Sequence, residues 1–310
     1  VNLPYAEQLK VKEVGFGKIY KAPYNYSDFS PMGIHRDVRT YGDWYDNATP
    51  SHAQGIAFTH RKTDDKDIYF ISNQQNKERY VEVEFRIKDK TPVIYNAVSD
   101  KYMSATITRK TGIGTSMILK FAPNESVFVI FQDNVILTDK ARTENWIKFK
   151  TTTNLSANWE VKFDPAFGGP SEPLNFNTLV DWTKHADTTV NYYSGTASYT
   201  KTITLHEAPR QKTWINLGNF SSIAEVKING VSFGVLWTPP YQLEVSKALT
   251  KGENQITIEI TNTWANRLIG DQKLPENKRL TKTTAPFRLA GKPLNPAGLF
   301  GPVTLEIEEK

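Results

Sequence analysis

Apolar and polar residues alternate through residues 223–237 and again through residues 255–260. The pair Asn229-Gly230 interrupts the first run, and such a pair accepts the positive φ that a type I′ hairpin turn needs at both central positions. Beyond the turn the apolar residues resume a period of two, and one face is expected to carry Val231, Phe233, Val235 and Trp237. This alternation is typical of antiparallel strands with one buried face, so it predicts a β-sandwich.

The first half of the chain carries a series of short strand patterns with polar turns between them. The clearest is the run YVEVEFRI at residues 80–87, in which polar and apolar residues alternate. Short strands at regular spacing are typical of an antiparallel sandwich. The expected strands lie at residues 56–58, 67–71, 80–87, 92–95, 102–109, 116–121 and 126–131.

The pattern divides the chain into three segments. Residues 1–52 are rich in proline and aromatic residues without a clear period, and we expect an irregular N-terminal segment there. Residues 53–150 are expected to form one antiparallel β-sandwich and residues 151–310 a second. Residues 303–307 are expected to return beside the early strands of the second sandwich and seal its core. The predicted fold class is therefore all-β, with two antiparallel β-sandwich domains.

Composition and charge narrow the classes of function. A net charge of +5 comes from 38 basic and 33 acidic residues, without a block of five or more consecutive basic residues, so nucleic-acid binding is not expected. The chain has no cysteine, which excludes disulfides, thiolate zinc sites and a cysteine nucleophile. No apolar run approaches the ~18 residues that a membrane-spanning helix requires, so no membrane span is expected.

Two motifs carry a resemblance to known families. The run AEVKINGVSFGVLWTPPYQLEVSKAL, with KGENQITIEI after it, resembles the jelly-roll sugar-binding domain of glycoside hydrolase family 2. The ending TNTWANRLIGD, together with LFGPV at residues 299–303, is closer to glycoside hydrolase family 106, the α-L-rhamnosidases. Similar segments extend back to about His60.

The resemblance implies that residues 151–310 form a galactose-binding-like jelly roll from the C-terminal region of a glycoside hydrolase that acts on plant or bacterial polysaccharide. Family 106 enzymes carry their catalytic acids and a calcium ion on a (β/α)8 barrel, and this chain lacks the required alternation of strand and helix. We therefore expect no catalytic residue here, and a catalytic barrel upstream as a partner. Residues 1–52 would then be the tail of that barrel or an arm wrapped on the next domain.

The absence of cysteine fits either the cytoplasm or an exported bacterial protein that does without disulfides, and of the two we expect a periplasmic or extracellular protein. No cofactor is expected, apart from room for a structural calcium ion. Within this frame, the chemistry expected of the chain is sugar recognition, which combines aromatic platforms with a few oriented polar groups. Two loops offer this mixture, and the candidate carbohydrate-binding residues are Trp237, Tyr241, Trp264, Asn266, Arg267 and Asp271. The alternative is a packed structural corner, in which the arginine stacks on the indole and bonds to backbone carbonyls.

A second polar cluster contains His60 and Arg61 near Asp64, Asp65 and Asp67. It could be a functional site, but the simpler interpretation is a hydrated turn with local ion pairs. Two further functions stay open at this stage. The chain could be a complete glycosidase with its acids assembled between the sandwiches, or a purely structural interaction module. The structural interaction module would be favoured if the indoles of Trp237 and Trp264 were fully buried.

Overall fold

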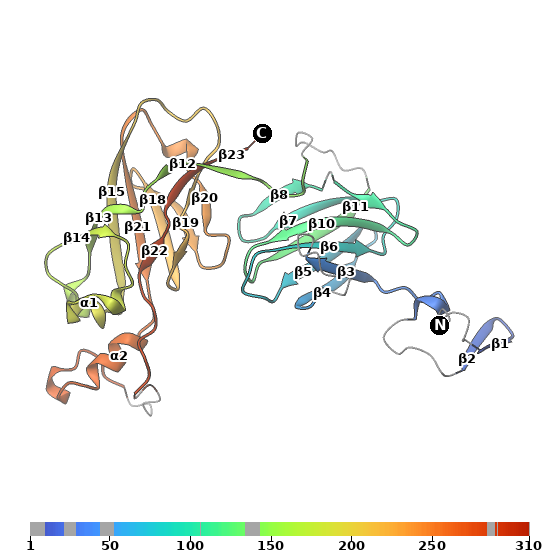
Figure 1. Cartoon of the computed structure of the whole chain (residues 1–310), viewed down its shortest axis with the longest axis horizontal. Helices are drawn as coiled ribbons and strands as arrows, with labels where there is room; N and C mark the ends of the chain where they lie inside the picture. The colour runs from blue at the N-terminus through green and yellow to red at the C-terminus, as the bar shows by residue number, and fades with distance from the viewer. Residues whose placement is uncertain are drawn as a thin grey trace, which may run out of the picture. The chain divides into compact units, whose positions relative to one another are not determined.

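The computed structural model describes residues 10–21, 29–43, 53–105, 107–133, 143–283, 289 and 291–309. The chain divides into two compact units, unit 1 (Val1–Trp146) and unit 2 (Ile147–Lys310), and each has its own sheets and hydrophobic core. All the paired strands within the named sheets run antiparallel (Figure 1), and the predicted all-β class is confirmed. The expected boundary at residue 150 falls inside strand β12 (Phe149–Asn154), which lies in unit 2.

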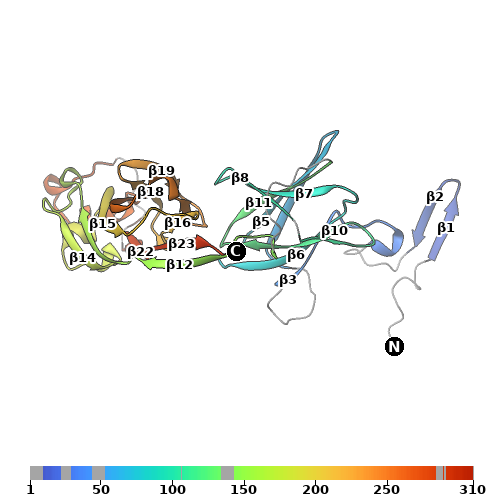
Figure 2. The same ribbon diagram turned by 90° about the horizontal axis from the view of Figure 1, so that it is seen from above.

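Unit 1 is a sandwich of two sheets, visible as two layers in Figure 2. One sheet has the order β3-β6-β10-β9 and the other β4-β5-β11-β7-β8, while β1 and β2 form a separate hairpin. The strands are β1 (Lys10–Val14), β2 (Gly17–Lys21), β3 (Val38–Asp43), β4 (Ile56–Lys62), β5 (Lys66–Asn73), β6 (Arg79–Phe85), β7 (Thr91–Asn96), β8 (Lys101–Ser104), β9 (Arg109–Lys110), β10 (Thr115–Phe121) and β11 (Ser126–Gln132); a 3-10 turn, η2, spans Ser30–Met32.

Alternation along the strands builds the core of unit 1. Every second residue of β5 is buried, so Tyr69 and Ile71 point inward and meet Val81 and Phe85 of the facing sheet. The N-terminal segment contributes more than the sequence indicated, because β3 pairs with β6 and Val38 joins the core. The stretch expected to be irregular therefore supplies an edge strand of the sandwich.

Unit 2 opposes a four-stranded sheet, β12-β23-β16-β20, to a six-stranded sheet, β14-β13-β15-β21-β18-β19, with β17 and β22 as a small extra pair (Figures 1 and 2). The last strand lies between β12 and β16, and Val303 and Leu305 are buried, which confirms the predicted role of residues 303–307. The strands are β12 (Phe149–Asn154), β13 (Ala157–Lys162), β14 (Leu174–Thr178), β15 (Thr196–Leu205), β16 (Thr213–Asn216), β17 (Asn219–Phe220), β18 (Ile223–Ile228), β19 (Val231–Leu236), β20 (Gln242–Glu244), β21 (Gly252–Thr261), β22 (Leu299–Gly301) and β23 (Thr304–Glu308).

The predicted hairpin joins β18 to β19, and both residues of its turn have the expected positive φ, 51° at Asn229 and 80° at Gly230. The prediction that the apolar residues of β19 and the following Trp237 share one face is wrong. The register shifts by one residue along this hairpin, and Gly234 lies at the shift with a φ of 103°. Leu236 is therefore buried in the core, whereas Val235 and Trp237 face solvent. A β-bulge of this kind turns the following side chains to the opposite face.

The segment that follows β21 contains a short helix. Helix α2 (Ala265–Asp271) carries Gly270 against the ring of Tyr192, where a Cβ atom would come within 2.7 Å of that ring. So short a helix is unstable alone and depends on this packing. The other helical elements are α1 (Thr188–Asn191) and the 3-10 turns η3 (Pro165–Phe167), η4 (Trp182–Lys184), η5 (Ser246–Ala248) and η6 (Glu276–Lys278); Figure 1 places α1 and α2 at the same end of unit 2.

Candidate functional site

The two candidate loops lie at the same end of the six-stranded sheet of unit 2. Ile260, near the end of β21, pairs with Ala224 of β18, and Ala224 in turn pairs with Leu236 at the end of β19. Trp264 follows β21 and Trp237 follows β19, so both residues leave the sheet at this end. Because one strand separates β21 from β19, the two strand ends are roughly 10 Å apart.

The aromatic candidates differ in exposure. The side chain of Trp237 is 63% exposed and that of Trp264 is 49% exposed. The indole of Trp264 packs edge-on against the ring of Phe167, with centroids 5.7 Å apart. Tyr241 is half-buried against Phe220, with centroids 4.4 Å apart, and burial raises the pKa of its hydroxyl. The two indoles therefore offer flat apolar surface to solvent, while Tyr241 belongs to the packing beneath the loop.

Two polar candidates on α2 fix the helix to its surroundings. Asn266 is 2% exposed, and its side-chain amide donates a hydrogen bond to the carbonyl of Asn295 at 2.8 Å. Oδ1 of Asn266 accepts a hydrogen bond from the backbone N–H of Asn295, also at 2.8 Å. The backbone N–H of Arg267 donates to Oγ of Ser194 at 3.0 Å. These bonds satisfy buried polar groups at the start of the helix.

Arg267 and Asp271 form a buried ion pair one helical turn apart. Nη1 of Arg267 lies 3.6 Å from Oδ1 of Asp271, and Oδ2 of Asp271 accepts from the backbone N–H and the hydroxyl of Thr281, both at 2.7 Å. Nε and Nη2 of Arg267 and Oδ1 of Asp271 are buried and have no hydrogen-bond partner among the residues that the structure describes. The pair supports the structural reading of these residues, and a ligand contact by Asn266, Arg267 or Asp271 stays a prediction.

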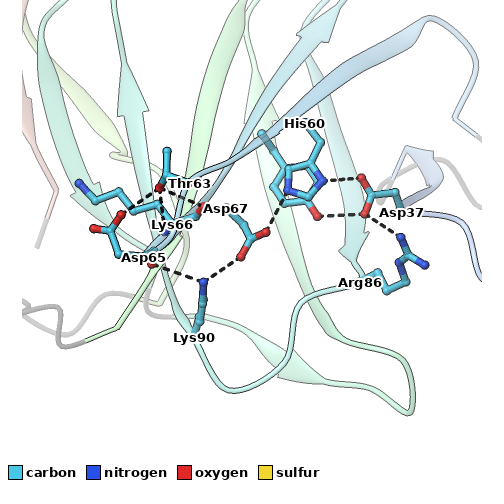
Figure 3. Close-up of polar contacts among 9 residues, drawn as sticks. Asp37, His60, Thr63, Asp65, Lys66, Asp67, Arg86 and Lys90 are labelled. Atoms are coloured by element: carbon cyan, nitrogen blue, oxygen red, sulfur yellow. Dashed lines mark hydrogen bonds and ion pairs between the residues drawn. The ribbon is translucent and has the colours of Figure 1, made fainter.

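Unit 1 contains a polar network around His60 (Figure 3). Nδ1 of His60 lies 2.7 Å from Oδ2 of Asp37, and Nε2 lies 3.1 Å from Oδ1 of Asp67. The imidazole stacks on the buried ring of Tyr69, with centroids 4.0 Å apart, and Lys90 donates to Oδ2 of Asp67 at 2.9 Å. Burial alone would raise the pKa of Asp67, but hydrogen bonds from Lys90 and His60 outweigh it and lower that pKa.

The network differs from the local turn that the sequence suggested. Asp65 does belong to the turn, where it accepts a hydrogen bond from the hydroxyl of Thr63 at 2.9 Å, and Arg61 and Asp64 are exposed. His60, however, reaches Asp37, which precedes β3, and so ties the N-terminal segment to strands β4 and β5. The imidazole ring fills the space between the two carboxylates and leaves no room there for a sugar.

Glu125, a partly buried acid of unit 1, makes the stability of this unit depend on pH. Its carboxylate accepts from the backbone N–H of Ala122 at 2.7 Å and from the amide of Asn96 at 3.0 Å, but burial outweighs these bonds and raises its pKa to about 7. The folded state therefore holds the proton more tightly than the unfolded state, and the free energy of unfolding falls as pH rises from about 4.5 to 7.

In the unaltered chain this fall in the free energy of unfolding is expected to be about 2 kcal/mol, and in Glu125→Gln it should be absent. Urea unfolding at several pH values would measure it. The exposed Asp64→Asn is the control, and an unchanged slope in Glu125→Gln would contradict the assignment.

No group of three or more His, Cys, Asp or Glu side chains in the described ranges is arranged to hold a metal ion. The helices that the structure describes are all too short or too polar to cross a membrane.

Comparisons with known proteins agree with the sequence motifs. The family model of glycoside hydrolase family 106, α-L-rhamnosidase, matches residues 2–108, which precede the two motifs at residues 261–271 and 299–303. The solved structure of a rhamnosidase from Novosphingobium sp. PP1Y matches with a TM-score of 0.79 and 31% identity, covering 96% of this chain and 27% of that protein. A putative β-glucuronidase of Formosa agariphila is 38% identical over 124 residues, 39% of this chain and 11% of that protein.

The chain thus spans about a quarter of the rhamnosidase that it matches. The predicted resemblance is confirmed: this chain is similar to the α-L-rhamnosidases of glycoside hydrolase family 106 in sequence over residues 2–108, and to a rhamnosidase in fold over nearly its whole length.

Proposed function

We propose that this chain is a non-catalytic, carbohydrate-binding and scaffolding C-terminal region of an α-L-rhamnosidase-like glycoside hydrolase. In this proposal unit 2 is a galactose-binding-like jelly roll, and a catalytic barrel elsewhere in the same protein cleaves plant or bacterial polysaccharide in the periplasm or outside the cell. The observation that carries the proposal is the pair of exposed indoles, Trp237 and Trp264, at one end of the six-stranded sheet.

The polar surroundings of Trp264 support this role. Sugar sites need apolar platforms on rigid supports, because a platform that must first be ordered loses binding energy. Trp264 begins a helix whose buried face is fixed by Asn266 and Arg267, and its ring is braced by Phe167. The exposure of both indoles argues against a purely structural module, which would favour buried ones.

The proposal also assigns the cleavage chemistry to another part of the protein. A glycosidase needs two carboxylates flanking the sugar, about 5 to 10 Å apart. Asp37 and Asp67 are the carboxylates that the structure brings together around His60, and the imidazole occupies the space between them. A purified sample of this chain is therefore expected to release no chromophore from an aryl α-L-rhamnoside, and turnover would favour the complete-glycosidase alternative.

Binding by the indoles is testable with rhamnose-containing oligosaccharides. We expect Trp237→Ala and Trp264→Ala each to weaken binding about tenfold, which corresponds to about 1.4 kcal/mol per platform. Isothermal titration calorimetry and tryptophan fluorescence would measure the change. Tyr102→Ala removes a comparably exposed aromatic ring from unit 1 and serves as the control, with binding expected to stay unchanged. If all three variants bind as the unaltered chain does, the indoles are not the site.

A further inference from the structure

Unit 2 contains a cavity at the end of the sandwich away from the two indoles. Its volume is about 450 Å³, within the range of small-molecule sites. It is lined by Leu205, the last residue of β15, whereas Thr196 at the other end of that strand pairs with Thr261, close to Trp264. The cavity and the indoles are thus separated by the length of β15 and are distinct sites.

The floor of the cavity is aliphatic. Leu205 of the six-stranded sheet and Leu305 and Ile307 of the four-stranded sheet line it together with Leu249. Leu249 and Leu305 are almost fully buried in the core of unit 2. Aliphatic side chains cannot provide the flat platform on which the ring face of a sugar stacks, but they fit a methyl group closely.

Polar residues share the lining with these aliphatic ones and are called the rim below; among them Thr152 is exposed and Thr213 is 6% exposed. The hydroxyl of Thr152 donates to the carbonyl of Leu305 at 3.1 Å, and that of Thr213 donates to the carbonyl of Gln211 at 3.2 Å. With its proton committed in this way, each hydroxyl oxygen keeps lone pairs that can accept hydrogen bonds from a ligand.

A charged pair completes the rim. Arg210 donates to Glu207 at 2.5 Å in the exposed loop before β16, and both residues line the cavity. The guanidinium has five N–H donors, and the exposed position of Arg210 leaves part of this fork directed to solvent. The rim thus offers both acceptors and donors around an apolar floor.

We propose that this cavity binds a 6-deoxyhexose residue, with the methyl group on the leucine floor and the ring hydroxyls on the threonine and arginine rim. The choice of a methyl-bearing sugar rests on the function proposed above, because rhamnose is 6-deoxymannose. The site itself rests on the volume of the cavity and on its two-part lining. It would give unit 2 a second glycan contact, suited to a terminal sugar rather than to an extended chain.

Calorimetric titration of the whole chain with L-rhamnose and L-mannose tests the proposal, because the two sugars differ only in the hydroxyl at C6. An aliphatic floor discriminates modestly against an added hydroxyl, so L-rhamnose is expected to bind roughly tenfold more tightly. Ala208 lines the cavity in the exposed loop, where a larger side chain fills the mouth without entering the core. We expect Ala208→Trp to weaken L-rhamnose binding at least tenfold and the matched Ala208→Ser to change it less than twofold, with thermal unfolding confirming that both variants fold.

The double variant Trp237→Ala/Trp264→Ala removes both platforms of the function proposed above, so L-rhamnose titrated into it reports on the cavity alone, and adding Ala208→Trp to this background is expected to abolish the binding that remains. If the double variant loses L-rhamnose binding while Ala208→Trp retains it, the cavity is not a sugar site, and the indole site stands. If Ala208→Trp alone loses binding, the cavity is supported whatever the indoles do. Equal binding of L-mannose overturns the role of the floor. The absence of any L-rhamnose binding to the unaltered chain overturns the cavity site, whereas the oligosaccharide titration decides separately on the indoles.

Discussion

Replacement of Gly298 by alanine is expected to lower the free energy of unfolding of unit 2 by about 3 kcal/mol or more. Gly298 has a φ of 113°, which side chains other than glycine rarely adopt, and a Cβ atom there would lie 2.7 Å from Nε1 of Trp182. That indole is fully buried and donates to the hydroxyl of Tyr199 at 2.6 Å, so it has no free space to move into. The backbone of Gly298 is held as well, because its N–H donates to Oγ of Ser221 and its carbonyl accepts from the backbone N–H of Ser221.

Gly234→Ala provides a matched control for the steric part of this effect. Gly234 has a similar φ of 103°, but nothing lies within 4 Å of the position that a Cβ atom would take. Its replacement should cost only the backbone strain, on the order of 1 to 3 kcal/mol, and Gly298→Ala should exceed it by a further overpacking term of about 1 to 3 kcal/mol. Urea unfolding followed by tryptophan fluorescence would compare them. If the two variants lose the same free energy of unfolding, the contact between the added Cβ atom and Trp182 contributes no destabilisation.

The strands could be predicted because their signal is local. In β5 and β11 every second residue is buried, so the alternation in the sequence maps directly onto the sandwich. The hairpin at Asn229 and Gly230 could also be predicted from the sequence, because its turn requires residues that tolerate positive φ. The exposure of Trp237 could not be predicted from the sequence, because it depends on the bulge at Gly234. A bulge leaves the pattern of apolar residues almost unchanged.

The parts of the candidate site that the sequence missed depend on contacts between distant residues. Helix α2 has no apolar period, and it exists because Gly270 packs on Tyr192 and Asn266 bonds to Asn295. Nothing in the sequence near His60 indicates that it reaches Asp37, since the pairing of β3 with β6 creates that contact. Propensity describes single segments, whereas these features need the assembled sheets.

Removal of the carboxylate of Asp271 is expected to destabilise unit 2 by about 3 to 5 kcal/mol. Asp271 is 2% exposed and lies 3.6 Å from the guanidinium of Arg267, which is 7% exposed. Two nitrogens of this guanidinium have no hydrogen-bond partner within the described part of the chain. Asp271→Ala would leave that buried positive charge without an ion pair, and a buried charge stripped of its partner is strongly unfavourable. The variant would also lose both hydrogen bonds from Thr281, and with them the attachment of the segment after α2.

The double variant Arg267→Met/Asp271→Leu tests whether the cost arises from the stranded charge. Replacement of a buried ion pair by apolar residues of similar size is often close to neutral, so the double variant should be more stable than Asp271→Ala despite carrying two changes. Urea unfolding would measure the difference, and Thr281→Ala would report the share that belongs to the threonine hydroxyl alone. If the double variant is no more stable than Asp271→Ala, the side chains of Arg267 and Asp271 are needed for their shape or their hydrogen bonds. Oligosaccharide titration of the double variant then separates two roles: retained binding assigns the pair to the support of Trp264, whereas loss of binding in a folded variant assigns it to the sugar contact.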